Sequence, residues 1–226
     1  AAYAVVAYQT AFLKCYYPVE FMAALMTSVI DNPGKVAEYI FNCRQLGIAI
    51  LTPDINVGEA SFSVDGGSIR YGLTAIKGLG KPVIAELVRE REANGPYKSL
   101  KDFTERLSNK EVNRRTIESF IKSGAMDSVP GTRKQKMYVY ASVLDRVAEE
   151  KKQSISGQMS LFDMIAPEEK QAYDNVFPEV GEYTKEELLA FEKEVLGIYI
   201  SGHPLEMYEA AMKKNVTKTT LDFMID

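Results

Sequence analysis

One stretch near the middle of the chain, residues 69–92, constrains the fold most. Its sequence, IRYGLTAIKGLGKPVIAELVRERE, places a short turn, Gly78-Leu79-Gly80, between two segments of helical periodicity. The pattern is that of a helix-hairpin-helix. We expect a short helix that ends at Lys77, two glycines that allow a turn too tight for a β-carbon, and a second helix that begins near Lys81. The apolar positions expected to face the core are Leu73, Ile76, Leu79, Ile84, Leu87 and Val88.

A helix that begins directly after such a turn points its first backbone N–H groups outward, and this arrangement favours a phosphate. Contacts to backbone phosphates would hold DNA without reading its sequence. An ordinary helical corner is the alternative, because Ile84 stands where such motifs usually have a small residue. The candidate DNA-binding residues of the turn are Lys77, Gly78, Leu79, Gly80 and Lys81.

Length and composition are those of a soluble globular protein. The chain has 226 residues, 46% hydrophobic and 26% charged, enough for one large or two small domains. Its two cysteines, Cys15 and Cys43, lack metal-site spacing, and we expect both to be buried free thiols of a cytosolic protein. The single histidine, His203, excludes a histidine-rich metal site and is interpreted as a turn residue. We therefore predict no metal site.

The apolar segments are too short for a membrane protein. No window has the roughly 20 apolar residues that a membrane-spanning helix needs, so we expect no membrane partner. The apolar start, Ala1–Leu13, lacks an initiator methionine and a basic region, and is therefore not a signal peptide. We expect a helix cut in its middle, in a fragment of a longer cytoplasmic protein. Residues 219–226 look like the start of a further domain.

The distribution of charge matters more than the net charge of −4, which would disfavour a DNA-binding protein. Residues 69–123 contain 12 basic and 7 acidic side chains, a net charge of +5 around the predicted hairpin. Residues 133–152 contain 6 basic and 3 acidic side chains, a net charge of +3. Residues 163–194 contain 3 basic and 10 acidic side chains, a net charge of −7. Positive charge is thus concentrated around the hairpin, and an acidic segment follows.

The first half of the chain predicts three helices and a small β unit. The helix over residues 1–17 is apolar nearly all round, so we expect it to be deeply buried, with its aromatic residues in core packing rather than base stacking. A second helix starts at Pro18, and a third, over residues 34–46, is capped by Asn32 and ended by Gly47. Short strands are expected over residues 48–51, 60–64 and 68–72, the last two joined at Asp65-Gly66-Gly67.

The second half predicts further helices over residues 81–93, 100–107, 114–123 and 133–152. The pair joined by residues 108–112 suggests a second, degenerate helix-hairpin-helix that lacks the glycine turn, so its role would be packing. Arg114 and Arg115 are the exception, because adjacent basic residues in a first helical turn can reach a phosphate. A solvated face is the alternative. Later, Thr184 is expected to cap a helix through Val195, followed by an apolar turn or strand and a final helix over residues 204–214.

Between these helices, residues 154–183 are rich in Ser, Gly, Pro and acids, and we interpret them as a mobile linker. The pentapeptide Gln158-Met159-Ser160-Leu161-Phe162 lies within it. No regular element presents this Leu-Phe pair to a core. Exposed apolar residues in a linker therefore suggest docking into the pocket of a partner protein.

Several stretches together resemble the alpha-subunit family of bacterial DNA polymerase III, the C-family replicative polymerases. They occur in the expected order, at about the expected spacing and over essentially the whole chain. The stretches are residues 2–24, 53–56, 70–80 (RYGLTAIKGLG), 112–127, 157–162 (GQMSLF) and 192–205 (EKEVLGIYISGHPL).

This resemblance implies a mainly α fold with four parts. Residues 1–68 would be the C-terminal part of the fingers domain, a helical portion with a small β-hairpin unit. Residues 69–153 would be a tandem helix-hairpin-helix, 154–183 a partly disordered linker with the clamp-binding pentapeptide, and 184–226 a helical connection toward an OB-fold domain that lies outside this sequence.

The resemblance also implies partners and chemistry. The parent protein would be a DNA-directed DNA polymerase that uses Mg²⁺, but the carboxylates of its palm domain have no counterpart here. We therefore assign no catalytic residue and no cofactor, and expect the fragment alone to be inactive. Expected partners are double-stranded primer-template DNA, other replicase subunits and the sliding clamp (beta subunit). By the family match, Gln158 hydrogen-bonds the rim of the clamp pocket, and Leu161 and Phe162 fill its floor.

Two other interpretations are kept. A helix-hairpin-helix DNA glycosylase would use a catalytic lysine at Lys77 or Lys81 and an aspartate such as Asp102, although Asp102 is also explained by helix capping, and no iron–sulfur cysteine set is present. A non-catalytic scaffold that binds DNA and the clamp would look the same at the level of this fragment.

Overall fold

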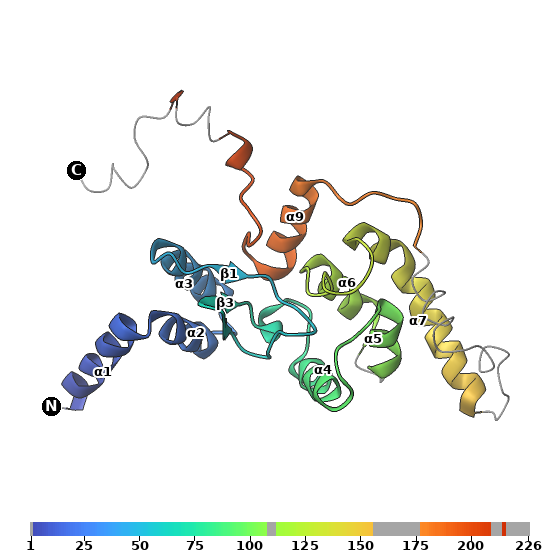
Figure 1. The fold of residues 1–226 in the computed structure, drawn as a ribbon, viewed down its shortest axis with the longest axis horizontal. Helices are drawn as coiled ribbons and strands as arrows, with labels where there is room; N and C mark the ends of the chain where they lie inside the picture. The colour runs from blue at the N-terminus through green and yellow to red at the C-terminus, as the bar shows by residue number, and fades with distance from the viewer. Residues whose placement is uncertain (1, 108–111, 156–176, 209–213, 216–226) are drawn as a thin grey trace.

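The structure, a computed structural model, describes residues 2–107, 112–155, 177–208 and 214–215. Within these ranges the chain is mainly α-helical with one small sheet, as the sequence predicts. Along the long axis of the molecule, α1 lies toward one end and α7 toward the other, with α9 between them above the body (Figure 1). The helices are α1 (Ala2–Tyr16), α2 (Pro18–Ser28), α3 (Pro33–Gln45), α4 (Lys81–Asn94), α5 (Leu100–Arg106), α6 (Arg114–Lys122), α7 (Arg133–Ile155) and α9 (Lys185–Leu196), with 3-10 turns η1 (Leu73–Ala75) and η3 (Glu206–Tyr208).

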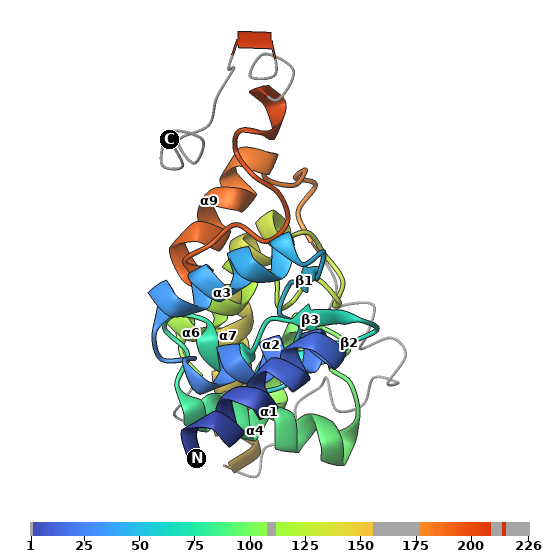
Figure 2. The same cartoon turned by 90° about the vertical axis from the view of Figure 1, so that its left-hand side faces the viewer.

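Helix α1 is exposed along its length, so the prediction of a deeply buried helix is wrong. The exposed fractions of Tyr3, Tyr8 and Tyr16 are 92%, 71% and 66%. The helix extends away from the body at the N-terminal end of the chain (Figure 1), and seen from that side it lies in front of the other elements (Figure 2). An apolar surface shows that a helix is suited to burial, but among the described residues no set of elements surrounds this one. Cys15, on α1, is exposed for the same reason, whereas Cys43 is buried as predicted, and both thiols are free.

The β unit has three strands, β1 (Ile50–Leu51), β2 (Ser63–Asp65) and β3 (Ser68–Arg70), in the order β1-β3-β2. The predicted hairpin is confirmed: β2 and β3 are antiparallel, and Gly66 and Gly67 have φ of +57° and +86° in the turn. β1 pairs parallel with β3, with Ile50 opposite Ile69. The sheet therefore delivers the chain directly from β3 into η1 and the predicted helix-hairpin-helix.

A single hydrophobic core connects the β unit with the helices on both sides. It extends from Met22 on α2 to Ile198 after α9, so residues far apart in the sequence share it. Ile69 of β3 and Leu73 of η1 are fully buried in this core. The region of the hairpin is thus held from the sheet side and from the side of α5, α6 and α9. The largest fully buried apolar side chains include Met22, Met26, Ile40, Ile55, Tyr71, Ile76, Ile84, Phe103 and Phe120.

The helix boundaries follow the local signals of the sequence. The side chains of Asn32, Ser99, Asn113 and Thr184 each accept a hydrogen bond from the backbone N–H three residues later, which satisfies one of the free donors of a helix start. Thr184 and Glu187 form a full capping box. Gly47 has positive φ, as predicted for a C-terminal cap, and the same holds for three further glycines that follow helices: Gly95, Gly124 and Gly197.

The end of the predicted linker packs against α7. Both carboxylate oxygens of Glu182 accept hydrogen bonds at the start of α7, from the N–H groups of Arg133 (2.8 Å) and Lys134 (3.0 Å). Gln135 Nε2 donates to Pro178 O at 3.1 Å. The prediction of a mobile linker therefore does not hold for residues 177–183, because a distant carboxylate caps α7 here. Residues 156–176 lie outside the described ranges.

Candidate nucleic-acid interface

The hairpin turn is built mostly as predicted, with two corrections. The first helix is a single 3-10 turn, Leu73–Ala75, and ends two residues before Lys77. Gly78 has φ of +85°, a conformation that favours glycine. Gly80 has φ of −80°, which any residue adopts, and is the N-cap of α4. Only one of the two glycines is therefore required by the backbone conformation of the turn.

The apolar residues of the hairpin hold α4 in place. Leu79 is partly buried and packs against the core, as predicted. Ile84 and Leu87 on α4 have exposed fractions of 0%. The large residue at position 84 is therefore accommodated in the core, and α4 begins directly after the turn, at Lys81.

The first turn of α4 presents unpaired backbone donors. Within the described part of the chain, the N–H groups of Gly80, Lys81 and Val83 form no hydrogen bond. Pro82 has no N–H group, and the first turn carries no acidic side chain. Three donors at the positive end of a helix macrodipole are therefore left for an external acceptor, and an anion is favoured there.

The two lysines of the hairpin differ in their surroundings. Lys77 is exposed, and its ammonium has no ion-pair partner among the residues that the structure describes. Lys81 Nζ lies 3.1 Å from Asp31 Oδ2, in a pair whose side chains are 69% and 77% exposed. Such an exposed pair has little strength and can exchange for a phosphate. Both lysines therefore add positive charge beside the amides of the turn.

The two arginines at the start of α6, Arg114 and Arg115, have different surroundings. A β-carbon on Gly78 would lie 3.1 Å from Ser119 Oγ and 3.8 Å from Arg115 Nε, so α6 packs directly against the turn. Arg115 is exposed, and no acidic side chain in the described ranges pairs with it. Arg114 instead donates to both carboxylate oxygens of Asp145 on α7, at 3.1 and 3.0 Å. The structure therefore brings Arg115 to the hairpin and directs Arg114 toward α7.

Helix α9 contacts the hairpin from another side. Lys77 N–H donates to Val195 O at 2.8 Å, and the Tyr71 hydroxyl donates to Leu196 O at 3.0 Å. Both acceptors lie at the C-terminal end of α9. Sequence periodicity does not predict these contacts, because the partners are far apart in the chain. Tyr71 and Leu196, for example, are separated by 125 residues. The hairpin therefore lies between α6 and the end of α9.

Two predicted sites lie where the structure gives no description. The pentapeptide Gln158-Met159-Ser160-Leu161-Phe162 is outside the described ranges, as are residues 108–111, which would join the second hairpin.

Asp102 accepts a hydrogen bond from Lys98 N–H at 2.9 Å and pairs with Arg106, beside the Ser99 cap of α5. Its role is thus explained by capping, as the sequence indicated.

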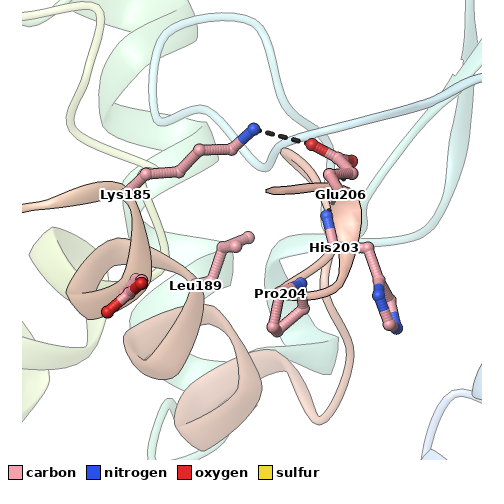
Figure 3. A pocket seen from close by; sticks show the side chains of 6 residues that line it. Lys185, Leu189, His203, Pro204 and Glu206 are labelled. Atoms are coloured by element: carbon pink, nitrogen blue, oxygen red, sulfur yellow. Dashed lines mark hydrogen bonds and ion pairs between the residues drawn. The ribbon is translucent and has the colours of Figure 1, made fainter. Parts of the chain in front are cut away.

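A separate hollow of about 300 Å³ lies beside α9, away from the hairpin (Figure 3). Lys185 and Glu206 form an ion pair of 2.7 Å across its rim, and Leu189 and Pro204 line it. His203 Nδ1 accepts a hydrogen bond from Leu205 N–H, which fits the predicted turn residue. Because the rim charges neutralise each other, this hollow offers less to an anion than the hairpin does.

Two other kinds of site are absent from the described residues. No group of three or more His, Cys, Asp or Glu side chains there could hold a metal ion. No helix in the same ranges is both long enough and apolar enough to cross a membrane.

Comparison with known proteins gives the family. A family model described as "Helix-hairpin-helix motif" matches residues 47–136, which include the hairpin, α4, α5 and α6. DNA polymerase III subunit alpha of Deinococcus radiodurans is 44% identical over 209 residues, 92% of this chain and 16% of the relative. The same subunit of Borreliella burgdorferi is 42% identical over 94% of this chain and 18% of the relative. The chain belongs to the DNA polymerase III alpha family.

DNA polymerase III subunit alpha of Campylobacter jejuni matches 99% of this chain at 38% identity and shows the same difference in length, with 19% of the relative covered. The chain therefore spans less than a fifth of the length of these DNA polymerase III relatives. The family assignment confirms the resemblance found in the sequence.

Proposed function

We propose that this chain is the part of a replicative DNA-directed DNA polymerase that binds duplex DNA through its phosphate backbone. The observation that carries the proposal is the set of three unpaired amides, at Gly80, Lys81 and Val83, inside the matched helix-hairpin-helix region. Backbone amides at a helix start match the oxygens of a phosphate and carry no information about the bases. Binding is therefore expected to be independent of sequence.

The charges around the turn fit the same ligand. Lys77 and Arg115 are exposed and lie on either side of Gly78, Lys77 one residue before it and Arg115 across from it on α6. Each cation that replaces a condensed counterion on DNA makes the affinity more dependent on salt. We therefore expect affinity to fall steeply as the salt concentration rises. Arg114, whose guanidinium is directed toward Asp145 on α7, contributes less.

Polymerase chemistry is proposed for the whole protein and not for this chain. We assign no catalytic residue here and expect the chain alone to incorporate no nucleotide. The whole polymerase is proposed to use Mg²⁺. No cluster of three candidate ligands for a metal ion lies in the described ranges, so no chemical step is placed on these residues. The role proposed for the chain is to hold the product duplex while another part of the protein extends the primer.

A second contact is proposed with the sliding clamp, through Gln158-Met159-Ser160-Leu161-Phe162. Leu161 and Phe162 would enter an apolar pocket on the clamp, and Gln158 would hydrogen-bond its rim. A tether to a ring around DNA raises the effective concentration of the polymerase at the primer end, so a weak peptide contact suffices. Other replicase subunits are further proposed partners, and the cytoplasm is the proposed location.

The glycosylase alternative is not favoured. Its catalytic aspartate would be Asp102, whose carboxylate is occupied by Lys98 N–H and Arg106 at the start of α5. The relatives that match most of the chain are polymerase subunits. A scaffold without catalytic activity describes the chain on its own, and differs from the polymerase proposal only in what the rest of the protein does.

Duplex binding is tested by titrating a fluorescently labelled duplex with the chain at two salt concentrations. We expect affinity to fall with added salt and to differ little between the duplex and a scrambled duplex of the same length. A preference of more than about tenfold for one sequence, about 1.4 kcal/mol, would contradict phosphate binding as the main contact.

Clamp binding is tested separately, with a bacterial sliding clamp and the variant Leu161→Ala/Phe162→Ala. We expect the chain to bind the clamp and the double variant to lose binding, while both bind duplex DNA equally. An unmodified chain that does not bind the clamp would remove the clamp proposal and leave the DNA proposal intact.

A further inference from the structure

The C-terminal end of α9 is joined to the hairpin by two hydrogen bonds. The last carbonyl groups of a helix have no partner inside the helix, and a buried carbonyl without a partner is costly. Here Val195 O accepts from Lys77 N–H at 2.8 Å and Leu196 O accepts from the Tyr71 hydroxyl at 3.0 Å. Val195 and Leu196 are both buried. The hairpin therefore supplies the donors that the end of α9 needs.

The ring of Tyr71 is held in place by its packing, independently of the hydrogen bonds of its hydroxyl. Its exposed fraction is 2%, and its ring packs edge-on against Phe62 with a centroid distance of 5.0 Å. The hydroxyl lies 3.0 Å from Leu196 O and 3.5 Å from Ala75 O, so it bridges α9 and η1. Burial raises the pKa of Tyr71, so the hydroxyl keeps its proton and remains a donor.

The turn after α9 also lies against the side chain of Lys77. Gly197 has φ of +79°, and a β-carbon on it would come within 3.8 Å of Lys77 Nζ. The C-terminal end of a helix carries partial negative charge, which favours a cation at this position. The end of α9 therefore accepts the backbone N–H of Lys77 and also lies near its ammonium. Lys77 directly precedes Gly78 in the turn.

We propose that Tyr71 is a positioning residue for DNA binding, which holds the end of α9 against the hairpin and so fixes Lys77 and the amides of the turn in the arrangement that a phosphate requires. This inference rests on the proposed function of the hairpin. It makes α9 a part of the DNA-binding element, although α9 follows the proposed clamp-binding pentapeptide in the sequence. Loss of the Tyr71 hydroxyl loosens the hairpin without removing any group that contacts DNA.

The variant Tyr71→Phe tests this, with Tyr97→Phe as a closely matched control. Tyr97 also has an exposed fraction of 2%, packs edge-on against a phenylalanine ring at 5.0 Å and donates its hydroxyl to a buried backbone oxygen, Leu87 O, at 2.9 Å. Its acceptor lies inside α4 and not on α9. Both variants lose one buried hydrogen bond and are expected to lower the melting temperature by similar amounts.

Tyr71→Phe is expected to raise the dissociation constant for a labelled duplex roughly fivefold, the change that one hydrogen bond of ordinary net strength produces. It should also speed amide hydrogen exchange at Lys77, whose N–H donates to α9. The slope of affinity against salt should not change, because no phosphate contact is lost. Tyr97→Phe should leave DNA affinity and Lys77 exchange as in the unmodified chain.

Two results overturn the inference while duplex binding by the unmodified chain stands. One is a Tyr71→Phe variant with unchanged DNA affinity, and the other is an equal loss of affinity in Tyr97→Phe, which would mean that destabilisation alone weakens binding. If the unmodified chain binds no duplex at low salt, the proposed function fails, and the positioning role fails with it.

Discussion

Arg115, in the first turn of α6, lies against Gly78 in the hairpin turn, where a β-carbon would come within 3.8 Å of Arg115 Nε. The neighbouring arginine, Arg114, makes an ion pair with Asp145 on α7 instead. Two adjacent basic residues, equivalent in the sequence, therefore face different parts of the molecule. The contact is the reason why the proposed DNA-binding site includes the second helix pair, although that pair lacks the glycine turn.

The first prediction follows from this difference. Arg115→Ala should weaken duplex binding and make the dependence of log affinity on log salt shallower by about 0.9, the contribution of one phosphate contact. Arg114→Ala is the matched control and should leave the salt slope unchanged and the affinity within about twofold, because its guanidinium is directed toward Asp145 on α7 and not toward the turn. The measurement is anisotropy titration over a series of salt concentrations. Equal effects of the two variants would show that the pairing of Arg114 does not matter in solution.

The second prediction concerns α1. Its side chains are exposed, and an isolated helix of this length is only marginally stable in water. We expect its backbone amides to exchange with deuterium faster than those of α3, which is shorter but buries Val36, Ile40 and Cys43. Peptide-level exchange measured by mass spectrometry distinguishes the two helices. Protection of α1 equal to that of α3, at a concentration where the chain is monomeric, would contradict the exposed position of α1.

The third prediction concerns Lys136, which is fully buried and donates a hydrogen bond from Nζ to Met126 O at 2.7 Å. Burial lowers the pKa of Lys136 from 10.5 to about 8. The folded state therefore releases the proton of Lys136 near pH 8, whereas the unfolded chain keeps it until about pH 10.5. As pH rises through this window the unfolded state binds more protons, so this side chain makes the free energy of unfolding rise.

Urea unfolding near pH 8 and near pH 10 measures that effect, which we expect to be on the order of 2 kcal/mol. The variant Lys136→Met should lack the rise. Burial raises the pKa of the Cys43 thiol from 9.0 to about 11, which lowers stability over part of the same range. The comparison between the two proteins cancels this term. A variant with the same pH dependence as the unmodified chain would show that the buried position of Lys136 is wrong.

The fourth prediction concerns the cap of α7. Both carboxylate oxygens of Glu182 accept backbone N–H groups at Arg133 and Lys134. Glu182→Ala removes this cap and should lower the free energy of unfolding by about 1 kcal/mol. Glu149→Ala on α7 is a control, because the Glu149 side chain is exposed and makes no hydrogen bond or ion pair with another described residue. Urea denaturation measures both, and equal stabilities would contradict a role of residues 177–183 in holding α7.

Features set by neighbouring residues could be predicted from the sequence. The caps at Asn32, Ser99, Asn113 and Thr184 depend on a polar side chain and a backbone N–H three residues away, so the signal is local. The hairpin at residues 78–80 and the β-turn at residues 65–67 depend on glycine in the same way. The predicted arrangement of the hairpin was therefore close to the one found, apart from the shorter first helix and the ordinary φ of Gly80.

Features that depend on distant partners could not be predicted. The sequence of α1 is apolar on most sides, but periodicity does not say whether other elements surround a helix. The contact of Tyr71 with Leu196 and the cap of α7 by Glu182 join residues that are far apart along the chain. Arg114 and Arg115 differ only because of what lies next to them in space. These relationships come from the packing of elements, which local patterns do not determine.

The most direct test of the central claim, that the hairpin turn holds the phosphates of duplex DNA, compares Gly78→Ala with Gly95→Ala. Both glycines have positive φ, +85° and +82°, and they flank the two ends of α4, so each substitution strains the backbone. A β-carbon at position 78 would press on Ser119 Oγ at 3.1 Å, whereas position 95 has open space.

The measurement is the dissociation constant for a labelled duplex at low salt, beside the melting temperature of each variant. We expect Gly78→Ala to weaken binding by about tenfold or more and Gly95→Ala to leave it nearly unchanged, even if both lower the melting temperature. Equal affinities for the two variants would contradict the claim that the hairpin is the DNA-binding site.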